Sequence, residues 1–184
     1  MSPSPEPTDR IAAFGNQLVD VHLYLREELT RLRADVAAHL ASGGERPREL
    51  RAHCLAFCSA LTRHHTAEDE GVFPALALRH PELRPVLDEL SRDHEQVTEL
   101  LRAVQKLVDG LGAGPEPDPA EARRISGELD GLVALVESHF TYEERKLVSA
   151  LNALNALDGS AGALPAGFEE FALSDLTERR ADPC

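Results

Sequence analysis

The stretch HHTAEDEGVFP, residues 64–74, places two adjacent histidines one helical turn before three carboxylates. It closes on Phe-Pro, a dipeptide that a helix does not tolerate in its interior. If the stretch is helical, His64 and Glu68 are four residues apart and lie on one face. Further along the chain, HFTYEERKLV from residue 139 repeats this relation between His139 and Glu143. Two such pairs of metal-ligand residue types require a chemical explanation.

Three breaker segments divide the rest of the chain: ASGGERP at 41–47, RHPEL at 79–83 and GLGAGPEPDP at 110–119. They leave four long segments between about residues 9 and 156, and each reads as an amphipathic helix. In each segment the apolar and histidine positions recur at intervals of four and three. The sets are Leu18, His22, Leu25, Leu29, Leu32 and Val36; Leu50, Cys54, Phe57, Leu61, His64 and Glu68; Leu87, Leu90, His94, Val97, Leu101 and Val104; and Ile125, Leu129, Leu132, Val136, His139 and Glu143. The pattern predicts an all-α fold, an up-down-up-down four-helix bundle.

Six potential ligands fall on these apolar stripes, where a polar side chain is costly unless it is paired or bound. They are His22, His64, Glu68, His94, His139 and Glu143. At ~1.5 Å of rise per residue, each pair of successive helices also brings its histidines to similar distances from the connecting loop, within a few ångströms. We therefore expect one polar layer in the core. His39, His53 and His80 lack this placement and are expected at the surface or at stripe edges.

Imidazoles and carboxylates that converge in a bundle core form a mixed nitrogen and oxygen ligand set, which suits iron, manganese or zinc. Two His/Glu pairs plus single histidines are enough for two ions, with carboxylates able to bridge them. The alternative for any one histidine is a core residue satisfied by a hydrogen bond to a carboxylate. Six coincident positions at one level favour metal.

These residues resemble the hemerythrin-like, HHE cation-binding family over about residues 11–156. The resemblance rests on a histidine in the first helix (His22), H-x-x-x-E with an acidic residue and Phe-Pro in the second, Asp93-His94 in the third, and H-x-x-x-E-E in the fourth. It implies a non-heme di-iron centre, often with an oxo or hydroxo bridge, that meets dioxygen or its relatives. Manganese or zinc is the less favoured metal.

The sequence departs from the oxygen-carrying members of that family, which have two histidines four residues apart on the third helix. Here the residues four before and four after His94 are Leu90 and Thr98. His65 could supply the missing nitrogen ligand, as an adjacent residue does in some relatives, or it could lie outside the ligand set. Ser149 also replaces a proline usual in the fourth-helix motif. An altered ligand set weakens the reversible-carrier reading and favours open positions for exogenous ligands.

The charge and the hydropathy of the chain argue against two kinds of partner and against a membrane location. The formal charge of −13 disfavours nucleic acid and anionic lipid. No signal-like or membrane-spanning apolar run is present, so we expect a cytoplasmic protein. Cys54 and Cys58 are expected to be small apolar core residues, with a redox pair as the lesser reading.

The domain expected from the sequence is a bundle over residues 9–156. It is preceded by eight disordered residues and followed by a tail, 157–184, with room for a short helix. Three functions remain open at this point: a di-iron protein that binds or reacts with dioxygen, peroxide or nitric oxide; a di-iron oxidase or oxygenase for a small organic substrate; and a metal-free structural bundle. Tyr24 and Tyr142 could donate to bound oxygen or carry an electron, although packing is the simpler role.

Overall fold

The computed structural model describes residues 14–42, 48–111 and 118–157, and these are helical apart from short connections. The four long helices are α1 (Phe14–Ser42), α2 (Arg48–Ala67), α4 (Arg84–Gly110) and α5 (Pro119–Leu157). No strand occurs within the described ranges, so the all-α prediction is confirmed. The predicted N-terminal eight residues and the tail beyond residue 157 lie outside the described residues.

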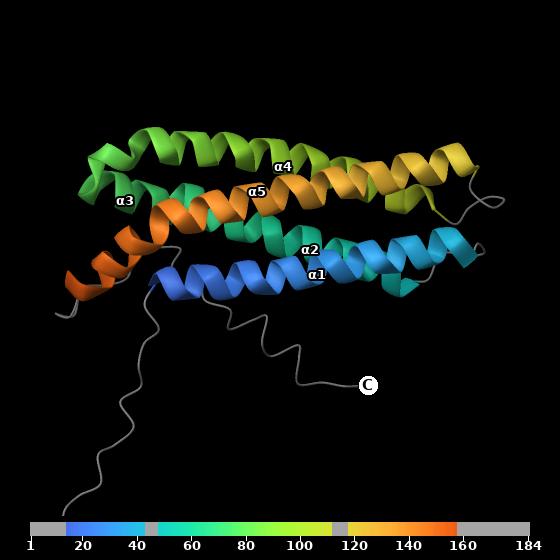
Figure 1. Cartoon of the computed structure of the whole chain (residues 1–184), viewed down its shortest axis with the longest axis horizontal. Helices are drawn as coiled ribbons and strands as arrows, with labels where there is room; N and C mark the ends of the chain where they lie inside the picture. Colours follow the sequence, from blue (N-terminus) through green and yellow to red (C-terminus); the bar gives the residue numbers. More distant parts are fainter. Residues whose placement is uncertain (1–13, 43–47, 112–117, 158–184) are drawn as a thin grey trace, which may run out of the picture.

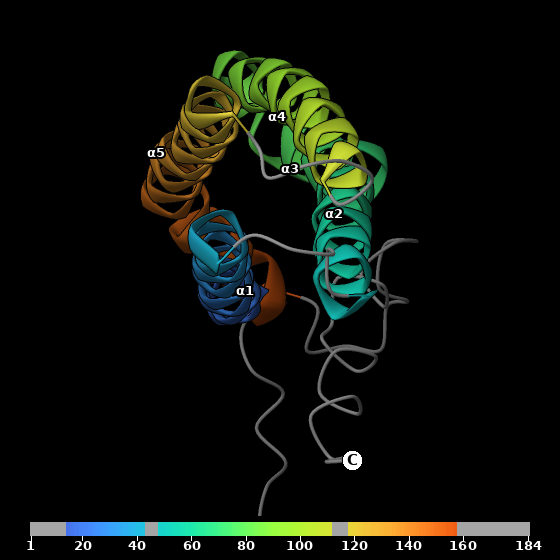
Figure 2. The ribbon, with the colours of Figure 1, turned by 90° about the vertical axis from the view of Figure 1, so that its right-hand side faces the viewer.

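The long helices lie side by side in an elongated bundle (Figure 1). Viewed from the end, they surround one interior: α1 neighbours α2 and α5, and α4 neighbours the same two helices (Figure 2). This arrangement is compatible with the up-down-up-down bundle that the sequence predicts. Among the described residues, no helix is both long and apolar enough to cross a bilayer.

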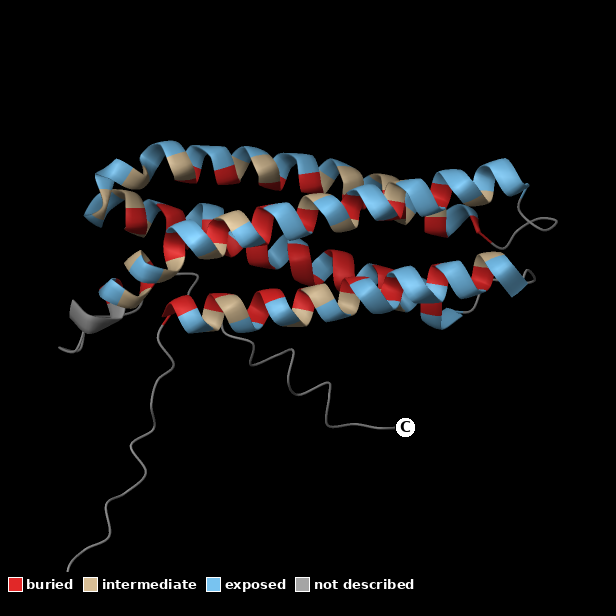
Figure 3. Ribbon diagram, in the orientation of Figure 1, coloured by how far each residue is buried: buried red, intermediate tan, exposed pale blue. Residues whose placement is uncertain are grey.

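The predicted stripes face this interior, and the outer faces are exposed (Figure 3). On α4, which has the clearest stripe, all six predicted positions are buried: Leu87, Leu90, His94, Val97, Leu101 and Val104. Burial of apolar side chains of this size stabilises the fold by about 1.5–3 kcal/mol each. The amphipathic pattern therefore positions the helices without help from unusual local sequence.

Two hydrophobic clusters fill the bundle, and the predicted polar layer separates them. On α1, Leu18 belongs to one cluster and Leu25 to the other, with His22 between them. On α4, His94 likewise stands between Leu90 and Val97. After α2 the change comes between Leu61 and Val72 of the π turn, and on α5 it comes between Phe140 and Leu147. The potential ligands thus lie where the chain passes from one apolar cluster to the other.

The Phe-Pro dipeptide does not stop the second helix at once. A π-helical turn, Glu68–Val72, follows α2 and leads directly into α3 (Phe73–Arg79). The Phe73 N–H donates to the carbonyl of Glu68, five residues back, and Pro74 sits in the first turn of α3, where its missing N–H is tolerated. The chain then turns through a 3-10 segment, Pro81–Leu83, into α4.

A hydrogen bond joins the first turn of α1 to α5. The backbone N–H of Gly15 donates to Oδ1 of Asn152 at 2.9 Å, which satisfies one donor that a helix N-terminus leaves free. A methyl group at residue 15 would approach the Val148 carbonyl oxygen to 2.6 Å. Only glycine therefore allows this close contact between the two helices.

Candidate metal centre

All seven residues predicted as ligands are buried in the layer between the two clusters. Each is at most 5% exposed: His22, His64, His65, Glu68, His94, His139 and Glu143. Their potential ligand atoms form two groups, each within a span of 4.8 Å. One group is His22, His64, Glu68 and Glu143; the other is His65, His94 and His139. The structure thus brings together every predicted site residue, His65 included.

The two carboxylates stand between the groups. Oε1 of Glu68 lies 3.3 Å from His64 Nε2, and Oε2 lies 3.5 Å from His94 Nε2. Oε2 of Glu143 lies 3.4 Å from His22 Nε2 and 3.6 Å from His139 Nε2. Each glutamate therefore faces one imidazole of either group, which is the placement that a carboxylate bridging two ions requires.

The imidazoles point their Nε2 atoms at one another within each group. These atoms are 3.0 Å apart in His22 and His64, and 3.1 Å apart in His94 and His139. The His65 ring lies parallel to the His94 ring, with centroids 3.9 Å apart. Convergence of several acceptor-capable nitrogens on so small a volume is unfavourable unless protons or a cation lie between them.

Several buried polar atoms of the layer have no hydrogen-bond partner among the described residues. They are both carboxylate oxygens of Glu68, both of Glu143, and Nε2 of His65. A buried polar group left in this state costs about 1–3 kcal/mol, and more if it is charged. Because five such atoms face one layer, the donor set fits a group of metal cations much better than it fits a closed hydrogen-bond network.

Burial sets the protonation of the layer. It lowers the pKa of His64 and of His65 well below the usual value, and neighbouring imidazoles lower both further. Burial, with the adjacent Glu143, raises the pKa of Glu68 well above its ordinary value. Burial also opposes ionisation of Glu143, but its contact with His22 outweighs that effect and lowers its pKa. Neutral imidazoles are the form that binds metal.

Carboxylates behind the layer orient three of the histidines through Nδ1. His94 Nδ1 lies 3.0 Å from Asp69 Oδ2, and His139 Nδ1 lies 3.4 Å from Asp93 Oδ2. His22 Nδ1 lies 2.9 Å from Glu144 Oε1. A carboxylate on the second ring nitrogen fixes the tautomer that leaves Nε2 free for a metal, and it raises the basicity of that nitrogen.

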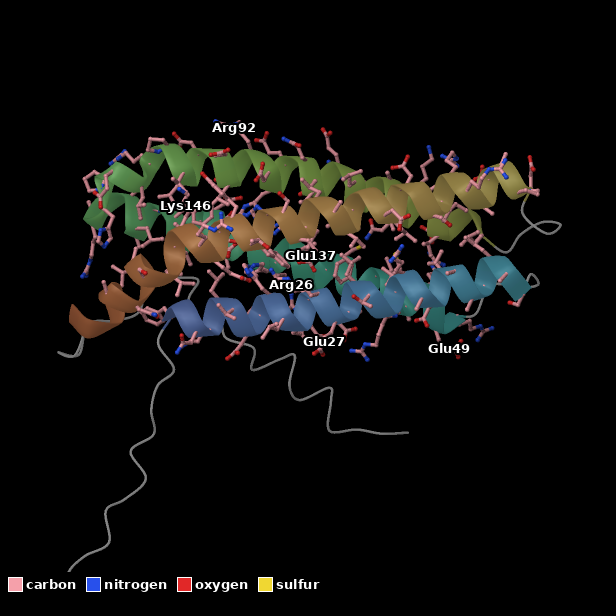
Figure 4. All side chains as sticks on the ribbon, viewed as in Figure 1. Arg26, Glu27, Glu49, Arg92, Glu137 and Lys146 are labelled. Carbon is pink, nitrogen blue, oxygen red and sulfur yellow. The ribbon has the colours of Figure 1, made fainter. Side chains whose placement is uncertain are left out.

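Among the described residues, an arginine contacts these outer carboxylates only on the His22 side of the layer. Arg26 donates from Nη1 to Glu144 at 2.7 Å and from Nε to Glu137 at 2.9 Å. Figure 4 shows Arg26 and Glu137 reaching toward each other between α1 and α5. The Phe140 ring stacks on His22, with centroids 3.8 Å apart, so the imidazole is held on its face as well as at its edge.

Asp69, Asp93 and Glu144 are the acidic residues of the family motifs, and their contacts with the histidines were not predicted. Each is next in sequence to a ligand candidate: Asp69 follows Glu68, Asp93 precedes His94, and Glu144 follows Glu143. That adjacency was the available signal. Arg26, four residues after His22, had none beyond its helical spacing.

The remaining histidines lie away from the layer. His39, expected at the edge of a stripe, is buried, 7% exposed near the end of α1. His53 is half-buried and lies 3.0 Å from Asp35 and 3.1 Å from Glu28. His80 is also half-buried, 3.2 Å from Glu82. None of the three belongs to either ligand group in the described ranges.

The other residues singled out by sequence have packing roles. Cys54 and Cys58 are buried in the larger cluster, as expected. The hydrogen bond with the Cys54 thiol, together with burial, raises the pKa of Cys58, so its thiol is protonated. Tyr24 packs against the same cluster, and the Tyr142 hydroxyl donates to Glu89 at 2.8 Å on the exposed side of α5.

Comparison with protein families agrees with the site. The hemerythrin HHE cation-binding domain matches residues 14–157, which spans all four long helices and every ligand candidate. The chain belongs to this family. Comparisons with curated proteins and with solved structures gave no match.

Proposed function

We propose that the layer is a dinuclear non-heme iron centre in an up-down-up-down bundle. The observation that carries this proposal is the position of Glu68 and Glu143, because each faces an imidazole of both ligand groups. His22 and His64 would hold one ion, His65, His94 and His139 would hold the other, and the two carboxylates would be shared. Such a mixed nitrogen and oxygen set suits iron, with manganese or zinc less favoured.

The two halves differ in their nitrogen donors. One has three imidazoles and the other has two, so the His22/His64 half has room for one more ligand from solution. Iron would supply redox chemistry and a place for a small ligand such as dioxygen, peroxide or nitric oxide. The chain itself contributes a dry layer: the flanking apolar clusters exclude water, and the outer carboxylates fix the imidazoles.

The organic-substrate alternative requires a hollow beside the His22/His64 half of the centre. Three surface depressions in the described residues have volumes of about 320, 340 and 400 Å³. The first and third contain no ligand candidate in their linings, and the second reaches only His65 and His94. None of these three offers an organic molecule a place beside His22 and His64.

Metal analysis combined with optical spectroscopy tests the proposal. Protein expressed with iron should contain about two iron ions per chain, and admission of air to the anaerobically reduced protein should produce near-ultraviolet oxo-to-iron charge-transfer bands. A single tightly held ion, or zinc alone after iron-replete expression, would contradict the dinuclear iron assignment. A His80→Ala variant is the matched control, because His80 lies outside both ligand groups.

A further inference from the structure

One surface depression leads from solvent to the nitrogen-rich half of the centre. It lies between α2 and α4 and has a volume of about 340 Å³. Two residues of its lining, His65 and His94, are buried ligand candidates at 4% and 3% exposure. The rest of the lining is polar or charged: Thr62, Thr66, Asp69, Glu95, Thr98, Glu99 and Arg102. We name this depression the α2–α4 groove.

The groove carries an excess of negative charge. Asp69, Glu95 and Glu99 contribute three carboxylates, and Arg102 contributes the one cation of the lining. All four residues are exposed. Charges of one sign in a surface hollow raise the local concentration of counter-ions and their rate of arrival. The groove therefore favours a cation over an anion or a neutral molecule.

A second observation points from the groove to the metal layer. His65 Nε2 is buried and has no hydrogen-bond partner among the described residues, and its side chain belongs to the groove lining. The carboxylates are hard oxygen ligands for a hydrated divalent ion, whereas the imidazole is the ligand that first-row metals prefer once dehydrated. A cation that enters the groove would therefore meet carboxylates first and an imidazole next.

The position of the groove argues against a route for the exogenous ligand. It reaches the half with three imidazoles, whereas the position open to a ligand from solution belongs to the His22/His64 half. A diatomic molecule entering here would meet the half of the centre that has the larger number of protein donors. A metal ion entering here would meet the donors that it needs.

We propose that the α2–α4 groove is the port through which hydrated divalent metal ions enter and leave the centre. Asp69, Glu95 and Glu99 attract the ion, and His65 and His94 receive it. This inference rests on the proposed metal site, but it concerns the rate of loading rather than the identity of the metal or its reaction.

Stopped-flow uptake of Co²⁺ by the metal-depleted full-length chain tests the port, with the cobalt d–d absorption as the readout. Glu95→Gln/Glu99→Gln should slow uptake about 3- to 10-fold at low salt and weaken its dependence on ionic strength, at unchanged final stoichiometry. Glu27→Gln/Glu49→Gln makes the same change in net charge at exposed positions on α1 and α2 that lie outside the groove lining, and should leave the rate unchanged (Figure 4). Arg102→Gln should accelerate uptake.

A steric variant tests the same route without changing charge. Thr98→Phe should slow both Co²⁺ uptake and its removal by a chelator at least several-fold, because a port limits both directions. Thr30→Phe, in the separate depression between α1 and α5, is the matched control. Co²⁺ uptake at the wild-type rate in both Glu95→Gln/Glu99→Gln and Thr98→Phe would contradict the proposed entry port without contradicting the metal site. Absence of any Co²⁺ binding by the wild-type chain would overturn both.

Discussion

His64 and His65 are adjacent in the chain, yet their imidazoles belong to opposite halves of the centre. His64 Nε2 lies 3.0 Å from His22 Nε2, whereas the His65 ring stacks on that of His94 at 3.9 Å. Successive residues of a helix diverge by ~100°, and here that divergence directs one side chain to each half. No distortion of α2 is needed to place both rings in the layer.

Replacement of His65 should therefore affect one half only. We expect His65→Ala to reduce binding of one metal ion and to leave the other ion bound, because the His22/His64 group keeps all its donors. Metal titration followed by calorimetry resolves the two binding events. An unchanged stoichiometry and unchanged affinities in His65→Ala would place His65 outside the ligand set.

Replacement of Glu68 should instead affect both halves. Its two oxygens lie 3.3 and 3.5 Å from imidazoles of opposite groups, so Glu68→Ala removes a donor from each ion. The same titration should show both affinities lowered. The control is Glu70→Ala, an exposed carboxylate two residues away in the same π turn. Loss of a single ion in Glu68→Ala would show that this carboxylate does not bridge.

Arg26 should tune the His22 half through Glu144. In Arg26→Gln, Glu144 loses its charged partner, and His22 is held less firmly. We expect about 10- to 100-fold weaker binding of the ion at that half, with Arg26→Lys recovering part of the loss. The readout is the ratio of the two dissociation constants, which a general loss of stability would not change selectively. Equal weakening of both ions would contradict the assignment.

Gly15 should matter for stability and not for metal. Gly15→Ala forces a contact of 2.6 Å with the Val148 carbonyl oxygen, and we expect a loss of about 1–3 kcal/mol in the free energy of unfolding. Gly127, on α5, has no such neighbour within 4 Å, so Gly127→Ala should stabilise the chain by about 0.5–1 kcal/mol. Urea denaturation of the two variants measures both values, and the same sign for both would refute the argument.

Much of this site follows from the sequence because helical periodicity and chain distance are both regular. The stripes place His22, His64, His94 and His139 inward, and counting residues from the loops puts them at one level. Whether His65 is a ligand was not decided by the sequence, because helical periodicity predicts one inward-facing side of α2. The two ligand groups are instead reached by side chains that leave the helix in two directions. Two ligand groups thus widen the range of directions from which side chains of α2 reach the layer.

The remaining features depend on long side chains and on tertiary packing. The contact of Arg26 with Glu144 joins residues 118 positions apart, and no local pattern encodes it. The burial of His39 depends on the packing at the end of α1, where periodicity alone gave only a stripe edge. The π turn was not predicted either, because a Phe-Pro dipeptide indicates that a helix is interrupted and does not indicate which conformation the backbone adopts there.

That π turn has a consequence for the phase of the helix beyond it. In an uninterrupted α-helix, Leu76 would lie about 80° around the axis from Glu68, at ~100° per residue. The π turn accommodates one extra residue and so rotates the following segment back by nearly that amount, and Leu76 is fully buried. A one-residue deletion within 69–71 would restore regular α-helical hydrogen bonding and preserve this phase, because Leu76 would then follow Glu68 by seven residues, about 700° or −20° around the axis. It would leave Glu68 in the layer, and Phe73 and Leu76 in the apolar cluster that seals one side of it.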